Sequence, residues 1–595
     1  MKGLITILSA LLFIASLQAG IIRIPADQPN IQAGIDAALE GDTVLVDEGL
    51  WYDQIFFRGK AVTVASHFIM DGDTNHIGNT IIDGSLNTDP DSGSVVYFIA
   101  GEDTNSVLCG FTITGGSGTI TEYSWHGGVF PGRTGGGVFT YNSGARISNN
   151  IIRNNNIPIY TNTYGGGINV YTGNSGAHAR IDGNKIITNI INGQGQSQGS
   201  GIFFHGDGTI ANNDISLNTT YANNEAFGAV GFWADSTLRH VLVKDNHITG
   251  NVVNGDYATA GGIQIEVGIK AVIIGNTISD NILNGIAFGE GGGIRLVWMT
   301  DMDTIDSNII TGNKVYGSSS YAGGIMIRDS ENTSNTLITN NIISGNSAKD
   351  GGGIRCLGSK AQMINNTIVN NIAGVGGGGL LVNGPLSEAI VINTILWGNS
   401  ALSGSQISIT GGLAPVASSD VEGGWPGDGN INADPFFADS LFNLADSSLC
   451  IGRGIDSLQI DNVWYYAPDH DFDGDPRPNP PGSMPDIGAQ ESPLGTPVAI
   501  EPISGLLPKT SALHQNYPNP FNPSTTIEFA LAKGGWVTLK IYNVLGEEVA
   551  ELVAESLSAG SYKYDWNAAG LASGMYFYRL EAGRYKQTRK LVLLK

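Results

Sequence analysis

Two acidic residues, Asp235 and Glu266, occupy matching positions in consecutive units of a sequence repeat. If these units stack as neighbouring β-strands, the two backbones lie about 4.8 Å apart. Glycosidases use two carboxyl groups roughly 5–10 Å apart, so the pair is a candidate for retaining glycosidase chemistry. His205, in the preceding unit, is a further candidate acid or base because its charge changes near neutral pH.

Aromatic side chains occupy the same outward positions in the earlier units. The candidate ligand-binding residues are Tyr141, Tyr171, Phe203, Trp233 and, further along, Arg355. Exposed aromatic rings mark binding surfaces, and sugar rings have apolar faces that stack on them while their hydroxyls bond to polar groups. The alternative is that loops fold over these rings and bury them as a second small core.

The residues above are positioned by units that begin with glycines and recur with a period close to thirty. Examples are "GGGINVY" at 165–171, "AVGFWAD" at 229–235, "AGGIQIE" at 260–266 and "GGGIRLV" at 291–297. Each unit contains three short runs rich in Ile and Val, separated by Gly and Asn, which is typical of strands and turns. Repeats of this length indicate a stacked architecture, here a parallel β-helix with three strands per coil.

Alternation along the glycine-led strand predicts which side chains point inward. The predicted inward pairs are Val138/Thr140, Ile168/Val170, Ile202/Phe204, Phe232/Ala234, Ile263/Ile265, Ile294/Leu296, Ile325/Ile327, Ile354/Cys356 and Leu380/Val382. Asparagines recur as N-x-I-x-x-N from Asn150 and Asn155 to Asn366 and Asn371, and we expect their side chains to hydrogen-bond from coil to coil.

Both ends of such a stack need caps. Residues 22–46 predict a short helix with Ile31, Ile35 and Leu39 on one face and Gly41 as its stop. This stretch resembles the N-terminal cap of the right-handed β-helix superfamily that includes pectate lyases and pectin esterases. The resemblance implies an all-β, right-handed parallel β-helix over residues 20–491, but the catalytic motifs of polygalacturonases and pectin esterases are absent.

Polyuronate lyases of this superfamily use acidic calcium ligands and a basic residue. The resemblance therefore implies a second chemistry, in which Asp235 and Glu266 hold a metal and Arg295 or Arg328 acts as base or charge neutraliser. The alternative is an ordinary surface ion pair, since acidic and basic neighbours commonly form one.

The closing segment contains "DHDFDGDPRPN" at 469–479. Asp469, Asp471 and Asp473 match the start of a calcium loop, so calcium is the one cofactor that the sequence suggests. Pro480 stands where the loop needs Glu, and the alternative is an acidic turn that closes the domain.

The tail changes in composition after a linker at 492–512. Residues 513–595 alternate as strands of a small Ig-like sandwich with six or seven strands. "YPNPFNP" at 517–523, "IYNVLG" at 541–546, "GMY" at 574–576 and the basic-apolar end resemble the type A C-terminal sorting domain of type IX secretion. This resemblance implies a Gram-negative cell, export through its outer membrane, and the secretion machinery as a partner.

Residues 1–19 read as a signal peptide with Lys2 before an apolar run. The net charge of −24 argues against nucleic acid as a partner, and no later segment is apolar enough to span a membrane. We therefore expect a secreted or surface-exposed β-helix protein that binds extracellular polysaccharide or serves as an adhesive or structural surface. The alternatives are a polysaccharide lyase or glycoside hydrolase acting on the same face, and a purely structural spacer.

Overall fold

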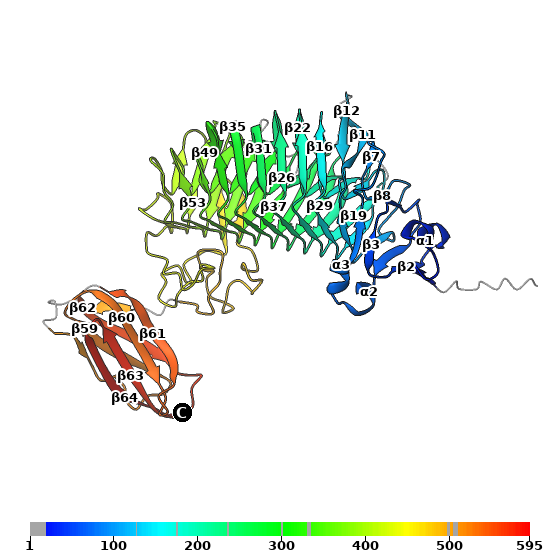
Figure 1. Ribbon diagram of the computed structural model, residues 1–595. Helices are drawn as coiled ribbons and strands as arrows, with labels where there is room; N and C mark the ends of the chain where they lie inside the picture. Colours follow the sequence, from blue (N-terminus) through cyan, green and yellow to red (C-terminus); the bar gives the residue numbers. More distant parts are fainter. Residues whose placement is uncertain are drawn as a thin grey trace, which may run out of the picture.

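The computed structural model describes residues 19–125, 128–173, 176–234, 237–298, 302–329, 335–496, 500–503, 510–557 and 559–594. Apart from Ala19, the predicted signal peptide lies outside these ranges. Figure 1 shows a long stack of parallel strands followed by a β-sandwich. The predicted parallel β-helix with a separate C-terminal sandwich is therefore confirmed.

Four sheets run along the stack. They extend from β1 (Ile21–Ile24) to β53 (Val416–Ala417), from β3 (Gly49–Trp51) to β54 (Asp420–Val421), from β7 (Ser92–Gly93) to β48 (Ile372–Ala373), and from β4 (Ile55–Phe56) to β52 (Ile407–Ile409). The sequence predicted three strands per coil and missed the sheet that contains β48, whose strands follow the second asparagine of each coil. Strands of this sheet, such as β26 (Thr219–Ala222), carry few of the alternating apolar residues that the prediction relied on.

The glycine-led strands form the 12-stranded sheet that carries most of the candidate residues. After β4 its strands are β8 (Val96–Phe98), β13 (Val138–Thr140), β18 (Ile168–Tyr171), β23 (Ile202–His205), β28 (Val230–Phe232), β32 (Ile263–Ile265), β36 (Ile294–Val297), β41 (Ile325–Arg328), β45 (Ile354–Leu357), β49 (Leu380–Asn383) and β52. Every predicted inward residue except the polar Thr140 belongs to the central apolar core, whereas the outward Phe139, Met326 and Leu381 are buried outside it, which confirms the alternation. The methyl and methylene groups of the inward residues fill the interior of the coils, where each fully buried Ile contributes about 1.5–3 kcal/mol.

The glycines before these strands allow the coils to approach each other. A Cβ atom added at Gly292 would lie 2.2 Å from the carbonyl oxygen of Gly323 on the next coil. Because no real Cβ approaches a backbone oxygen so closely, only glycine permits the stacking at this corner.

Two asparagine ladders run through the interior of the stack. The first joins Asn150, Asn184, Asn213, Asn246, Asn276, Asn308, Asn341 and Asn366, and the second joins Asn155, Asn189, Asn218, Asn251, Asn281, Asn313, Asn346, Asn371 and Asn399. Apart from the last member of each ladder, every side-chain amide donates to the next ladder oxygen and to a backbone carbonyl of the coil before it, as Asn308 donates to Asn341 and to Ile273. The predicted structural role of these asparagines is thereby confirmed.

The N-terminal end is closed by α1 (Ile31–Ala37), which lies at the blue end of the stack in Figure 1. The side chain of Asn30 caps this helix by accepting from the backbone N–H of Ala33 at 2.8 Å, and Ile31 and Ile35 are buried. The prediction was wrong for Leu39, which is 58% exposed because the helix ends at Ala37 and the chain turns outward.

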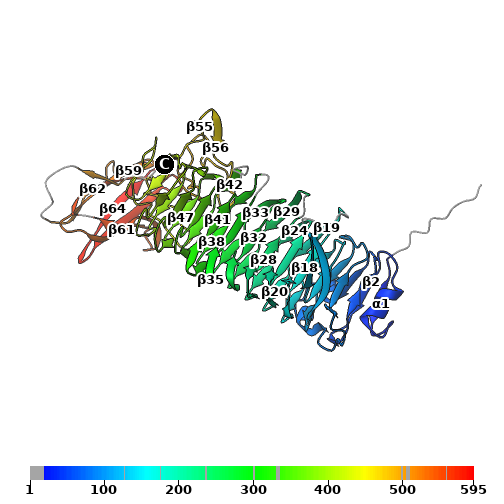
Figure 2. The ribbon, with the colours of Figure 1, turned by 90° about the horizontal axis from the view of Figure 1, so that it is seen from above.

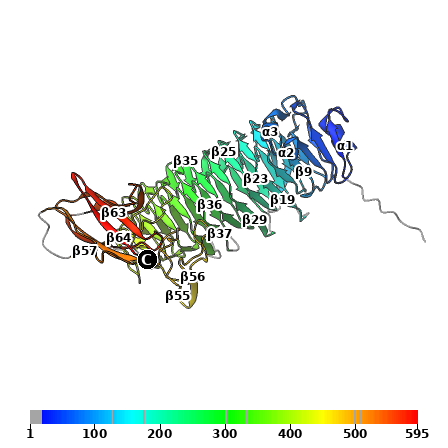
Figure 3. The ribbon, with the colours of Figure 1, turned by 90° about the horizontal axis from the view of Figure 1, so that it is seen from below.

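The closing segment after β54 has little regular structure apart from one hairpin, β55 (Ser457–Ile460) and β56 (Val463–Tyr466), which projects from the stack in Figures 2 and 3. The sandwich pairs β57 (Ile500–Ile503), β62 (Gly560–Asn567), β59 (Ser524–Leu531) and β58 (Ala512–Leu513) in one sheet. The other sheet contains β61 (Glu548–Leu557), β60 (Gly535–Tyr542), β63 (Gly574–Ala582) and β64 (Tyr585–Leu593). The first of these strands, β57, comes from the stretch predicted as linker.

Candidate functional site

The register of β28 changes the predicted row of catalytic residues. Phe232 pairs with Ile265 of β32, so Trp233, not Asp235, stands beside Glu266 on the adjacent coil. Ile202 is the fourth residue of its unit, but it pairs with Val230, the second residue of the unit at 229–235. The unit at 229–235 is therefore offset by two residues. The inward pattern survives this offset because two residues restore the same face. Asp235 itself lies outside the described residues, so the predicted pairing of its carboxylate with Glu266 stays a prediction.

The outward aromatic residues of the middle coils form a small core of their own. Phe203 is fully buried and Trp233 is 7% exposed, both packed with Tyr164 of β17 (Thr163–Tyr164), a strand of the neighbouring sheet. The Tyr164 and Phe203 rings lie 4.9 Å apart, and burial raises the pKa of the Tyr164 hydroxyl. Two of the predicted ligand-binding rings are therefore covered by protein, as the alternative interpretation of the sequence described.

A second stack runs alongside this core. Tyr141 and Tyr171 are half-buried with ring centroids 5.0 Å apart, and the imidazole of His205 lies 4.5 Å from the Tyr171 ring. His205 is only 3% exposed, which places this candidate acid or base away from solvent. Arg355 is also buried, with its guanidinium 3.9 Å from the Tyr321 ring centroid, and burial lowers its pKa. This contact is a cation–π interaction.

The open part of this face is a cleft of about 420 Å³ beside the buried aromatic core. Its walls come from β27 (Glu225–Phe227), β31 (Val252–Thr259), β35 (Ile282–Glu290), β36 and β41. Aromatic rings and charged groups alternate around it, and the lining residues are Gln196, Glu225, Phe227, Tyr257, Thr259, Glu266, Phe288, Arg295, Trp298 and Arg328. The structure therefore brings together three predicted residues, Glu266, Arg295 and Arg328, at one site.

Glu266 is the cleft residue whose pKa is raised. Burial raises its pKa, while the charge of Arg295 and a hydrogen bond from the Gln264 amide, at 3.1 Å, oppose the rise. The nearby carboxylate of Glu225 raises the pKa further. Such a carboxyl group holds its proton at higher pH than an exposed one, which is the property required of a general acid.

Glu290 is a functional-site residue that the sequence analysis missed. It is 1% exposed, and its Oε1 accepts hydrogen bonds from Arg295 Nε at 2.6 Å and from Arg328 Nη1 at 3.3 Å. One buried carboxylate therefore fixes both guanidinium groups at the cleft. Its position at the end of β35, directly before a glycine-led strand, was the available signal, but the corresponding residue in the next coil is Tyr321.

The candidate calcium residues serve the closing segment instead. Asp471 is buried, and its carboxylate accepts backbone N–H groups of Asp473, Asp475 and Glu491 at 2.9–3.0 Å. The Asp469 side chain is 98% exposed and bonds to His470. Among the described residues, no group of three His, Cys, Asp or Glu side chains is arranged to hold a metal ion. Asp471 therefore closes an acidic turn, and calcium binding by these aspartates stays a prediction.

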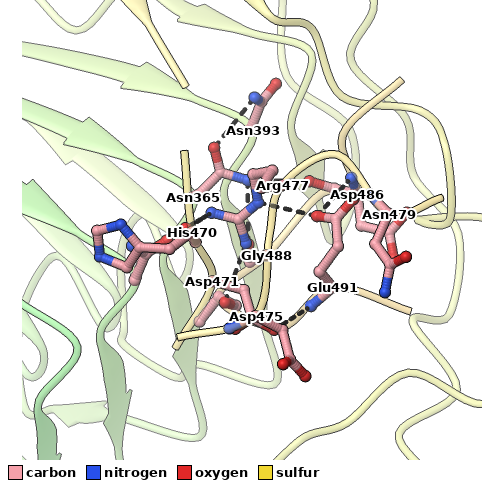
Figure 4. A network of polar contacts seen from close by, with 12 residues as sticks. Asn365, Asn393, His470, Asp471, Asp475, Arg477, Asn479, Asp486, Gly488 and Glu491 are labelled. Atoms are coloured by element: carbon pink, nitrogen blue, oxygen red, sulfur yellow. Dashed lines mark hydrogen bonds and ion pairs between the residues drawn. The ribbon is translucent and has the colours of Figure 1, made fainter. Parts of the chain in front are cut away.

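Figure 4 shows the polar network that holds this turn against the stack. Arg477 and Glu491 form a fully buried ion pair with Nε and Oε2 2.8 Å apart, and Arg477 also donates to the carbonyl oxygen of Ala489 at 3.0 Å. Asn365, from a turn of the stack, donates to the backbone oxygen of Asp486 at 2.9 Å. Burial and the charge of Glu491 raise the pKa of Asp486 to about 7.

The tail can be assigned by comparison with known proteins. Residues 515–594 match the family model of the secretion system C-terminal sorting domain. This match confirms the sorting domain, and the chain is a secreted or outer-surface protein. No curated protein matches the chain. Within the described ranges, no helix has the length and apolarity needed to cross a lipid bilayer.

Proposed function

We propose that this exported protein binds extracellular polysaccharide in the cleft beside Glu266. The observation that carries the proposal is the composition of the cleft wall, where Tyr257, Phe288 and Trp298 stand among carboxylates and guanidinium groups. Trp298 is 46% exposed and Tyr257 is 49% exposed, so both rings are available to a ligand. Aromatic faces suit the apolar faces of sugar rings, and the charged groups suit their hydroxyls and substituents.

The location of the cleft supports this proposal. It opens on the side of a rigid stack, so a long polymer could pass along the coils without needing an enclosed pocket. Glu290 holds Arg295 and Arg328 in place before any ligand arrives, which reduces the entropy lost on binding. The sorting domain directs the protein to the compartment in which polysaccharides are found.

The experiment is affinity electrophoresis of the secreted protein in gels that contain xylan, alginate or polygalacturonate. At least one polymer should retard the protein, and Trp298→Ala and Tyr257→Ala should each weaken that retardation about tenfold, the equivalent of about 1.4 kcal/mol. Tyr52→Ala is the matched control because Tyr52 is 54% exposed on the N-terminal coils. Unchanged mobility in every polymer, or equal retardation of wild type and both cleft variants, would contradict the proposal.

A second candidate function is hydrolysis or eliminative cleavage of the bound polymer. The raised pKa of Glu266 in a cleft that also contains Glu225 and Arg295 favours it, because a protonated carboxyl group can donate to a leaving oxygen. New reducing ends or unsaturated uronate would appear with wild-type protein and disappear with Glu266→Gln while binding persists. If a polymer retards the protein but no polymer yields a product, the protein acts as a binding protein.

A further inference from the structure

The β55–β56 hairpin is a second candidate surface, remote in sequence from the cleft. Its two strands are joined by Asp461 and Asn462, whose positive φ angles of 47° and 64° form the tight turn that antiparallel strands favour. The hairpin protrudes from the closing segment beside the 14-stranded sheet (Figures 2 and 3). Such a short turn fixes the register and leaves the ribbon little freedom to change shape.

The inner face of the hairpin anchors it to the stack. Leu458, Ile460 and Tyr465 pack against a cluster of buried isoleucines on the outer surface of the 14-stranded sheet, namely Ile364, Ile390 and Ile392. Tyr465 is half-buried, and burial raises the pKa of its hydroxyl. The hairpin therefore has a solid support, which an isolated two-stranded ribbon lacks.

The outer face carries two large rings in solvent. Trp464 is 52% exposed and Tyr466 is 65% exposed, with ring centroids 6.4 Å apart and ring planes only 27° from parallel. Across the ribbon, Gln459 faces Trp464 and Ser457 faces Tyr466. The result is a pair of exposed, nearly parallel aromatic rings edged by an amide and a hydroxyl group.

The polar groups and charges around the two rings indicate which class of ligand fits this surface. A lipid or an apolar protein surface would leave Gln459 and Ser457 without hydrogen-bond partners, whereas a sugar offers a C–H face to the rings and hydroxyls to the polar edge. The segment from Gly454 to Pro468 contains Asp456 and Asp461 and no Lys or Arg, so a polyanion would be repelled. These charges favour an uncharged polymer.

From these observations we propose that the outer face of the β55–β56 hairpin, named here the aromatic platform (Ser457, Gln459, Trp464 and Tyr466), binds uncharged polysaccharide with flat chain faces. The platform would hold the protein on an insoluble glycan independently of the cleft. The inference does not depend on what the cleft binds.

The test measures depletion of the full secreted chain from solution by microcrystalline cellulose, an uncharged glucan with flat chain faces. Trp464→Ala and Tyr466→Ala should each lower the affinity about tenfold, and the double variant should abolish retention. Trp464→Tyr keeps a flat ring and should keep most of the affinity. Tyr52→Ala is the matched control, because its ring is equally exposed on coils far from the hairpin. Circular dichroism melts should not differ among these variants, since the rings removed are exposed.

Cellulose retention by the variants shows whether the platform proposal or the cleft proposal is wrong. No retention on cellulose, or equal retention of wild type and Trp464→Ala, overturns the platform. Loss of all retention in Trp298→Ala with Trp464→Ala unaffected also overturns it, because cellulose would then bind only in the cleft. If Trp464→Ala instead abolishes self-association measured by light scattering without changing cellulose retention, the platform is an interface between copies, and the inference is wrong.

Discussion

Replacing one ladder asparagine should destabilise the β-helix strongly. Asn308 occupies the middle of the first ladder, where its side-chain oxygen accepts from both the backbone nitrogen and Nδ2 of Asn276 at 2.9 Å. Its own Nδ2 donates to the carbonyl oxygens of Ile273 and Asp306 and to Oδ1 of Asn341, each at 2.9 Å. All of these groups are shielded from water inside the stack.

The magnitude follows from this bond list. In Asn308→Ala the backbone N–H of Asn276 loses its acceptor, which costs about 1–3 kcal/mol for a buried donor. The bond from Asn276 Nδ2 and the two bonds that the two Nδ2 hydrogens of Asn308 make also disappear, at about 1 kcal/mol each. The total is about 5 kcal/mol. Asn308→Thr should cost less, since Thr394 occupies the corresponding ladder position in the last coil and its hydroxyl accepts from the backbone nitrogen of Asn366 at 3.3 Å.

Urea unfolding followed by circular dichroism, together with hydrogen exchange of the amides in β34 (Thr277–Ser279) and β38 (Ile309–Thr311), measures this loss. Both readouts are needed because coils of a stacked protein can open locally. Asn105→Ala is the control: Asn105 is exposed and its amide bonds only to Asp103. A loss below about 1 kcal/mol for Asn308→Ala, similar to that of the control, would refute the conclusion that the ladder stabilises the fold.

Two further predictions concern pH and packing. The pKa of Asp486 is raised in the folded protein, so wild-type stability should fall as the pH rises from about 4 to 7, where only the unfolded state loses this proton. Asp486→Asn lacks this contribution, and the melting temperature of the variant relative to wild type should rise over the same interval and stay constant above it. A relative melting temperature that is flat from pH 4 to 7 would contradict this reasoning. Gly292→Ala should cost about 3 kcal/mol in urea unfolding because its Cβ meets the Gly323 carbonyl oxygen, whereas Gly78→Ala, with open space around it, should be neutral. Equal stability of these two variants would show that the close approach at Gly292 is not required.

The sequence predicted the coils well because their inner half obeys a strict rule. Alternation and glycine spacing predict that Ile294 points inward and Arg295 outward. The unit containing Trp233 was aligned two residues out of register, but a shift of two residues leaves the same side chains pointing inward. The outer surface follows no such rule. Whether Trp233 is exposed depends on Tyr164 of the neighbouring sheet, and the residue beside Glu266 depends on an offset that the apolar pattern does not record.

The charged part of the site was predictable only in part. Glu266, Arg295 and Arg328 were found because they recur at outward positions of the repeat, and the structure lines one cleft with them. Glu290 was missed because it ends β35, a strand of the sheet that the sequence did not predict, and only its contacts with Arg295 and Arg328 reveal its importance. The aspartates at 469–473 matched a metal motif, yet backbone N–H groups occupy the Asp471 carboxylate oxygens.

The stacking geometry also fixes the distances between surface sites along the axis of the β-helix. Each coil advances the chain by about 4.8 Å, so the separation along the axis between the cleft and the hairpin is set by a whole number of coils. The cleft is bordered by β41, and the hairpin rests on β46 (Lys360–Ile364) and β50 (Glu388–Ile392), only a few coils further along. Gain or loss of one coil between them would change their spacing by one fixed step and leave the internal geometry of both untouched.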